Sequence, residues 1–159
     1  MRKPKAYLET TVFNHYFDTD REAHADTVQL FLQIRAGQYE AFTSSYVIDE
    51  LRKAGEPKRS KMLELIGEYN ITVIPGDNES QDLTDKYVNE GVIPAKYRYD
   101  GLHIAIATIN DLEYVFSSNF EHINKVKTKT MTGLVNVREG YKPITIASPM
   151  EMIEHDENE

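Results

Sequence analysis

Residues 100–119 read DGLHIAIATINDLEYVFSSN, and this stretch does most to decide the fold. Residues 100–110 are apolar on nearly all sides of a helix, which is typical of a helix buried at the centre of a domain. The β-rich run at 114–116 then predicts a strand, and the polar residues 117–119 end it. A buried helix followed at once by a short strand indicates a protein in which helices and strands alternate.

The rest of the chain repeats this alternation. Strands are predicted at 6–8, 39–43, 71–74, 114–116 and 144–146, and helices at 21–36, from about 47 onward, and at 60–69, 80–89 and 100–110. Ser44 and Ser45 are candidate N-caps for the helix near Val47, and Gly37 and Gly91 end two other helices. The predicted fold is α/β: a three-layer α/β/α sandwich around a mainly parallel sheet of about five strands.

Two of the predicted helices carry an apolar stripe that should face the core. In helix 60–69 the stripe consists of Met62, Leu65, Ile66 and Tyr69. In helix 21–36, the apolar Val28, Phe31 and Leu32 fall on one stripe together with Arg35.

The composition fits one domain and excludes several kinds of site. The chain has 159 residues and no cysteine, which excludes disulfides, zinc-thiolate sites, iron–sulfur clusters and a cysteine nucleophile. We expect a single domain at 1–153 and an acidic disordered tail at 154–159. No apolar run is long enough to cross a membrane and no signal-peptide stretch is visible, so we expect a cytoplasmic protein without a membrane partner.

The net charge at first disfavours a nucleic-acid partner. The formal charge is −8, of which residues 151–159 contribute −5, so the rest of the chain carries only −3. Three basic stretches could contact phosphates locally: Arg52, Lys53, Lys58, Arg59 and Lys61; Lys96 and Arg98; and Lys125, Lys127 and Lys129. The global sign of the charge therefore does not decide the question.

Acidic and polar residues follow the predicted strands at their carboxyl ends. Glu9 follows the first strand, Glu50 lies in the helix after the second, Asp100 opens the central helix, and 117–119 follow the fourth strand. Parallel strands bring these ends to one edge of the sheet, where carboxylates repel one another unless a cation binds. Oxygen ligands of this kind favour Mg²⁺ or Mn²⁺ over zinc.

Each of these residues also has an alternative interpretation. Glu9 could mark the exit of the chain to solvent, Glu50 could be a solvated helix residue, and Asp100 could be an N-cap. His103, one turn after Asp100, is expected to be a buried histidine with satisfied hydrogen bonds rather than a ligand. The serines at 44, 45 and 117 could serve only as caps and turn formers.

Four segments resemble the PIN-domain proteins, a family of metal-dependent ribonucleases that includes many toxins of toxin-antitoxin pairs. They are AYLETTVFNHYFD at 6–18, FTSSYVIDELRKA at 42–54, YRYDGLHIAIATINDLEYVFSSNFEHI at 97–123 and GYKPITIASPMEMI at 140–153. The resemblance matches Glu9, Glu50 and Asp100 to the acidic residues of the family. Asn119 falls on its fourth position, which is often aspartate, so one ligand charge is missing here.

The resemblance implies a divalent-metal-dependent ribonuclease whose products carry a 5′-phosphate. The implied metal ligands for Mg²⁺ or Mn²⁺ are Glu9, Glu50 and Asp100, with Asn119 as a fourth catalytic residue. The candidate substrate-binding residues are Thr10, Thr11, Ser45, Arg98 and Ser117. The implied partners are single-stranded RNA, an antitoxin protein and a second copy of the chain.

Other functions remain as alternatives. Because Glu9 and Asn119 depart from the usual pattern, the domain could be a catalytically weakened module that binds RNA or a protein. A doubly wound nucleotide or flavin module is disfavoured, because Glu9-Thr10-Thr11 replaces a glycine-rich loop after the first strand. A dehalogenase-type phosphatase would need an aspartate pair after that strand, and a receiver domain would need an aspartate where Pro75-Gly76 stands.

Overall fold

The structure is a computed structural model that describes residues 2–152. Five parallel strands form one sheet, as the sequence predicted, and their order in it is β3-β2-β1-β4-β5. Their bounds are Lys5–Leu8 (β1), Glu40–Ser44 (β2), Thr72–Ile74 (β3), Tyr114–Phe116 (β4) and Thr145–Ala147 (β5). The predicted acidic tail at 154–159, and residues 1 and 153 of the predicted domain, lie outside the described residues.

Strand β1 lies at the centre of the sheet and is buried on both faces. Ala6, Tyr7 and Leu8 are all inaccessible to solvent, and Tyr7 pairs with Phe42 of β2 and Val115 of β4. A parallel strand covered on both faces has this continuous apolar sequence. The chain builds β2 and β3 on one side of β1 before it crosses to β4 and β5 on the other. Such a reversal leaves a crevice at the carboxyl ends of the strands.

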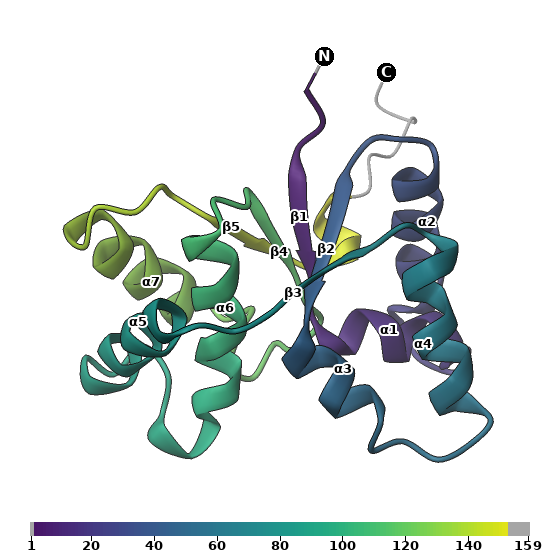
Figure 1. Ribbon diagram of the computed structural model, residues 1–159, viewed down its shortest axis with the longest axis horizontal. Coiled ribbons are helices and arrows are strands. Elements are labelled where there is room, and N and C mark those ends of the chain that lie inside the picture. Colours follow the sequence, from purple (N-terminus) through teal and green to yellow (C-terminus); the bar gives the residue numbers. More distant parts are fainter. Residues whose placement is uncertain (1, 153–159) are drawn as a thin grey trace.

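The helices form the two outer layers (Figure 1). One layer contains α1 (Thr10–Phe17), α2 (His24–Arg35), α3 (Ser45–Leu51) and α4 (Lys58–Glu68). The other contains α5 (Asn78–Asn89), α6 (Arg98–Ile109) and α7 (Val126–Arg138). A 3₁₀ turn at Ala95–Tyr97 precedes α6, and the short α8 (Pro149–Met152) packs against α2. The predicted three-layer sandwich is therefore confirmed.

Helix α6 is the central buried helix that the sequence predicted. Every residue from Gly101 to Thr108 is buried. Among residues 2–152, no helix is both long and apolar enough to cross a membrane.

The predicted core face of α2 is wrong by about one residue. Leu32 is 47% exposed and Arg35 also faces solvent, whereas Thr27, Leu30, Phe31 and Ile34 are buried. Thr27 can occupy the buried stripe because its hydroxyl donates to the Ala23 carbonyl within its own segment, at 2.7 Å. Because the hydroxyl of Thr27 is hydrogen-bonded, this residue can be buried like an apolar one. The buried face of α2 is therefore shifted by one residue from the predicted face.

Candidate active site

All three acids that the sequence singled out lie near the carboxyl ends of the strands. Glu9 follows β1 directly, Glu50 lies in the last turn of α3 after β2, and Asp100 lies in the first turn of α6. The charges of Glu9 and Glu50 both act on Asp100. The strand ends thus bring the three carboxylates into one electrostatic neighbourhood.

Glu9 is held in place from two sides. Its side chain is 3% exposed, and its Oε1 accepts hydrogen bonds from Thr11 N (3.2 Å), Thr11 Oγ1 (2.6 Å) and Ser117 Oγ (2.7 Å). The bond to Thr11 N also makes Glu9 the N-cap of α1. The interpretation of Glu9 as an exit to solvent is therefore wrong, because this carboxylate points inward and links β1 to the loop after β4.

Glu50 is the outer end of a buried hydrogen-bond chain. His103 Nε2 donates to Glu50 Oε1 at 2.8 Å, His103 Nδ1 lies 2.6 Å from the Tyr7 hydroxyl, and that hydroxyl lies 2.7 Å from Ser44 Oγ. His103 is thus a buried histidine with both ring nitrogens bonded, as predicted. The chain connects α3, α6, β1 and β2, so it fixes the orientation of the Glu50 carboxylate.

The same chain sets the protonation of its members. Burial would raise the pKa of Glu50, but the hydrogen bond from His103 and its charge outweigh burial and hold that pKa below the usual glutamate value. Burial would lower the pKa of His103, but the bond to Glu50 and the surrounding carboxylates raise it above the usual histidine value. Glu50 is therefore ionised over a wide pH range.

The surroundings of Asp100 disfavour the ionised form of its carboxyl group. Its side chain is 19% exposed, and burial raises its pKa above the usual aspartate value. The charges of Glu9 and Glu50 raise it further, against the opposing effect of His103 and His122. Asp100 is not an N-cap, since Tyr97 occupies that position without a side-chain cap bond. A bound cation would offset the repulsion between a partly buried carboxylate and two others nearby.

The donor set suits Mg²⁺ or Mn²⁺ in kind, but it is not arranged as a metal site. Within residues 2–152, no three Asp, Glu or His side chains are placed to hold one ion. Each carboxylate instead lies against another group of the protein: Glu9 accepts from Thr11 and Ser117, Glu50 accepts from His103, and Asp100 lies 3.3 Å from His122. Carboxylate oxygens are the ligands that these hard cations prefer. Side chains must leave their present partners before they could share an ion.

The predicted substrate-binding hydroxyls divide into two groups. Thr11 and Ser117 are committed to Glu9, and Thr11 Oγ1 also accepts from Ser118 N at 2.8 Å. Thr10 lies beside Glu50, where it lowers the pKa of that carboxyl, and its buried Oγ1 makes no hydrogen bond of normal geometry among the described residues. Ser44, not Ser45, caps α3, through a 3.3 Å bond from Val47 N, and Ser45 is the first helical residue.

Asn119 and Arg98 are engaged elsewhere in the fold. The Asn119 Oδ1 accepts from His122 N at 3.0 Å, so this side chain shapes the loop after β4. The Arg98 guanidinium pairs with Asp85 at 2.7 Å and donates to the Gln81 carbonyl at 3.3 Å, both in α5. Arg98 therefore ties α6 to α5.

Sequence reasoning missed His122. Its Nδ1 lies 3.3 Å from Asp100 Oδ2, and its ring stacks on Tyr97 with 3.8 Å between the ring centroids. The only local signal is Asn119 three residues earlier, a spacing at which an asparagine side chain bonds the backbone of a turn. The contact with Asp100 joins two distant parts of the chain, so no local pattern indicates it.

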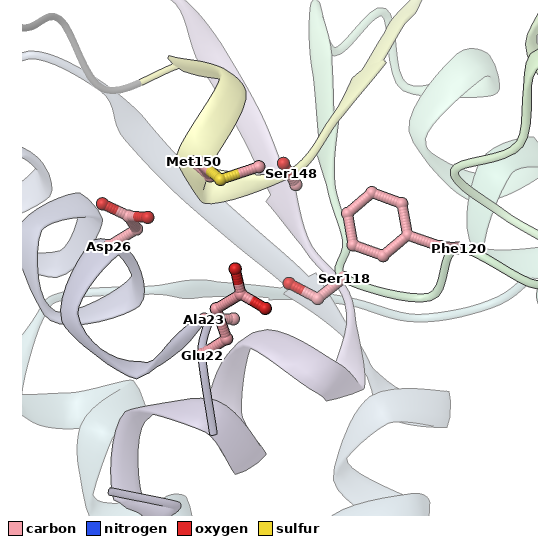
Figure 2. Close-up of a pocket in the computed structure, with 7 residues that line it drawn as sticks. All are labelled: Glu22, Ala23, Asp26, Ser118, Phe120, Ser148 and Met150. Carbon is pink, nitrogen blue, oxygen red and sulfur yellow. The ribbon is translucent and has the colours of Figure 1, made fainter. Parts of the chain in front are cut away.

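A small cavity of 140 Å³ lies on one side of the loop after β4 (Figure 2). Ser118 and Phe120 line it from the loop, Glu22, Ala23 and Asp26 from the start of α2, and Ser148 and Met150 from the start of α8. Within the described part of the chain, the buried Ser118 Oγ has no hydrogen-bond partner. The charged residues that line the cavity, Glu22 and Asp26, are both acidic.

Neither a protein-family model nor a curated protein matches the sequence. Solved structures match over most of the chain. VapBC2 from Rickettsia felis, bound to a DNA fragment from its promoter, matches with a TM-score of 0.56 at 10% identity, over 91% of this chain and 98% of that one. VapC20 from Mycobacterium tuberculosis, described as a toxin that cleaves the sarcin-ricin loop, matches with a TM-score of 0.54 at 11% identity, over 87% and 98%.

DNA-bound VapBC from Salmonella typhimurium gives a TM-score of 0.54 at 13% identity, over 92% of this chain and 98% of that one. Identities this low concern the fold alone. The five-stranded parallel sheet with helices on both faces agrees with them, and the predicted PIN-like architecture is confirmed. The chain has the PIN-domain fold of the VapC toxins.

Proposed function

We propose that this protein is a divalent-metal-dependent ribonuclease that hydrolyses phosphodiester bonds of single-stranded RNA. The observation that carries the proposal is Asp100, a half-buried carboxylate whose pKa is raised by burial and by Glu9 and Glu50, near the carboxyl ends of the strands of a PIN fold. Excess negative charge held in one crevice is suited to a cation and then to a phosphate. The similarity to VapC20, a toxin that cleaves RNA of the sarcin-ricin loop, points the same way.

Glu9, Glu50 and Asp100 would hold Mg²⁺ or Mn²⁺. When bound, the ion would supply a lowered pKa for a water molecule and polarisation of the scissile phosphate. The residues around the acids position them: Thr11 and Ser117 orient Glu9, and His103 orients Glu50. Thr10, whose buried hydroxyl lies beside Glu50, is a candidate to donate to a phosphate oxygen. The products would carry a 5′-phosphate and a 3′-hydroxyl.

The proposed biological setting is a toxin-antitoxin pair. Two of the similar structures are VapBC complexes, which supports an antitoxin protein as a partner of this chain. A homodimer is also proposed, from the family resemblance.

A second candidate is a PIN-like module that binds RNA or a protein without cleaving. The observation that favours it is Asn119, which carries no charge and whose side-chain oxygen is used by His122 N. The metal site would then lack one of the four ligands of the family pattern. This module would bind RNA in the presence of Mn²⁺ without turnover.

Cleavage of a single-stranded RNA in Mg²⁺ or Mn²⁺ distinguishes the two. The nuclease account predicts cleavage by the wild type, with 5′-phosphate ends, and at least a hundredfold loss in Asp100→Asn and in Glu9→Gln. Asp49→Asn is the matched control, because Asp49 is an exposed acid next to Glu50 whose one ion pair within residues 2–152 is with Arg52, at 3.9 Å. Equal cleavage by Asp100→Asn and the wild type would refute the assignment, and RNA binding without any cleavage would favour the module.

A further inference from the structure

A second cavity, of 240 Å³, lies on the other side of the loop after β4. We name it the lysine cavity, and its lining includes Val92, Ile93, Pro94, His122, Lys125 and Lys127. We propose that the lysine cavity binds the nucleotide next to the scissile phosphate. Lys125 and Lys127 would contact its phosphate, and its base would lie against the apolar part of the lining, where Pro94 is the exposed residue. This inference rests on the proposed ribonuclease function and adds a substrate subsite to it.

His122 connects the lysine cavity to the acid site. His122 lines the cavity, and its Nδ1 lies 3.3 Å from Asp100 Oδ2. Tyr97 stacks on the His122 ring, so this histidine is held between the cavity and the acid. A strand of RNA with one phosphate at Asp100 would therefore place a neighbouring nucleotide at the cavity.

The two lysines that line the cavity are free to bind an anion. Lys125 and Lys127 are exposed, and within residues 2–152 neither side chain makes an ion pair or a hydrogen bond. By contrast, Lys129 pairs with Glu151 at 3.4 Å. The basic stretch 125–129 thus divides: one lysine joins α7 to α8, and two remain for a ligand. An ammonium group without a partner is a ready donor to phosphate oxygens.

Part of the lining is apolar. Pro94 is exposed there, whereas Val92 and Ile93, which also line the cavity, belong to the hydrophobic core at 3% and 0% exposure. Ligand sites combine an apolar wall with a few placed polar groups. The cavity is smaller than the roughly 300–1,000 Å³ of sites for drug-sized ligands, so it suits one small group such as a single base.

The charges of the two cavities set the direction of the strand. The loop 118–122 separates them: Ser118 and Phe120 face the first cavity, and Glu121 and His122 face the second. The first cavity adds two carboxylates, Glu22 and Asp26, and no basic group (Figure 2). The lysine cavity contains one acid, Glu121, against two lysines. A polyanion that leaves the acid site is therefore drawn toward α7 and away from α2.

Binding without cleavage tests this proposal. The full chain is titrated in EDTA with a fluorescein-labelled ten-nucleotide single-stranded RNA and with the same strand made abasic. Lys125→Ala/Lys127→Ala is compared with Lys3→Ala/Lys142→Ala, which removes two exposed lysines before β1 and β5, at the opposite edge of the sheet. Because Lys125 is the N-cap of α7, Lys127→Gln alone is measured as well, and thermal melts check folding.

We expect Lys125→Ala/Lys127→Ala to raise the Kd for the RNA at least tenfold. It should also reduce the slope of log affinity against log salt by about 0.7 per lost phosphate contact. Lys127→Gln should give a smaller loss in the same direction, the control pair should stay within twofold, and the abasic strand should bind several-fold more weakly. Equal effects of the two double variants on the Kd, or no effect of either, would overturn the subsite. Equal affinity for the abasic and the normal strand would overturn its base-binding part.

The outcomes also separate this subsite from the proposed function. RNA cleavage by the wild type with unchanged binding in the cavity variants would leave the ribonuclease standing and remove the subsite. Weakened binding in those variants, with no cleavage by the wild type in Mn²⁺, would leave a nucleotide subsite on a non-catalytic domain.

Discussion

At the scale of single residues, the site is organised by side chains that are not ligands. The sequence pattern does not assign Tyr7, Ser44 or His103 to the site. In the structure these residues form the buried hydrogen-bond chain that ends on Glu50. Burial raises the pKa of Tyr7 well above the usual tyrosine value, so its hydroxyl stays protonated and available for hydrogen bonds. Such outer partners fix a carboxylate more precisely than its own helix does.

Tyr7→Phe tests this chain through stability. The change removes one hydroxyl and leaves the buried Ser44 Oγ and His103 Nδ1 without that partner. An unsatisfied buried polar group costs about 1–3 kcal/mol, so the free energy of unfolding in urea should fall by that amount. Tyr16→Phe is the control, because the half-buried Tyr16 hydroxyl has one hydrogen-bond partner in the described part of the chain, the Tyr69 hydroxyl. An equally small loss of unfolding free energy in both variants would show that this hydrogen-bond chain does not stabilise the site.

At the scale of elements, the strands were the most predictable feature. Each predicted strand matches the structure to within a residue at either end, because buried parallel strands are short apolar runs with clear polar stops. The acids were predictable for the same reason, since strand ends fix their position. Their partners were not, because His122 and His103 reach them across the fold.

Three helices, α1, α7 and the short α8, escaped prediction, and the two longer ones did so for physical reasons. Helix α1 begins with two threonines and is rich in aromatic residues, which are weak helix formers. Helix α7 buries Thr128, Thr132 and Asn136, while Val126, Leu134 and Val137 face solvent. Its pattern of hydrophobicity is thus nearly inverted, and periodicity alone does not find such a helix.

Helix α5 offers a prediction about capping. The Asp77 carboxylate accepts from Ser80 N at 2.8 Å and Ser80 Oγ at 2.6 Å, and these bonds hold its pKa below the usual aspartate value. Asp77→Ala should cost about 1 kcal/mol at pH 7. A lowered pKa means that the cap stabilises the fold above the unfolded pKa, and that this contribution is lost as the pH falls through the folded pKa.

Urea unfolding of the wild type and of Asp77→Ala at several pH values measures this difference. It should be constant from pH 7 to about pH 5 and shrink below pH 4. Asp82→Ala, an exposed acid in the middle of the same helix, should show no such dependence. A difference that grows on acidification would contradict the capping role.

At the scale of the whole molecule, charge is distributed unevenly. Residues 153–159 contain four acids and no lysine or arginine, so the chain without them has a formal charge of −4 instead of −8. Removing them should speed RNA association at low salt, since long-range repulsion slows the encounter. The two rates should converge at 1 M salt, where screening acts over about 3 Å. Stopped-flow association measures this, and identical rates at low salt would show that these acids have no long-range effect on RNA.

The central claim is that Glu9, Glu50 and Asp100 together hold a divalent cation. Calorimetric titration with Mn²⁺ tests it without any assumption about the RNA. We predict saturable Mn²⁺ binding by the wild type, at least tenfold weaker binding by Asp100→Asn, and unchanged binding by Asp49→Asn. Absence of Mn²⁺ binding by the wild type, or equal affinity in Asp100→Asn, would contradict the account.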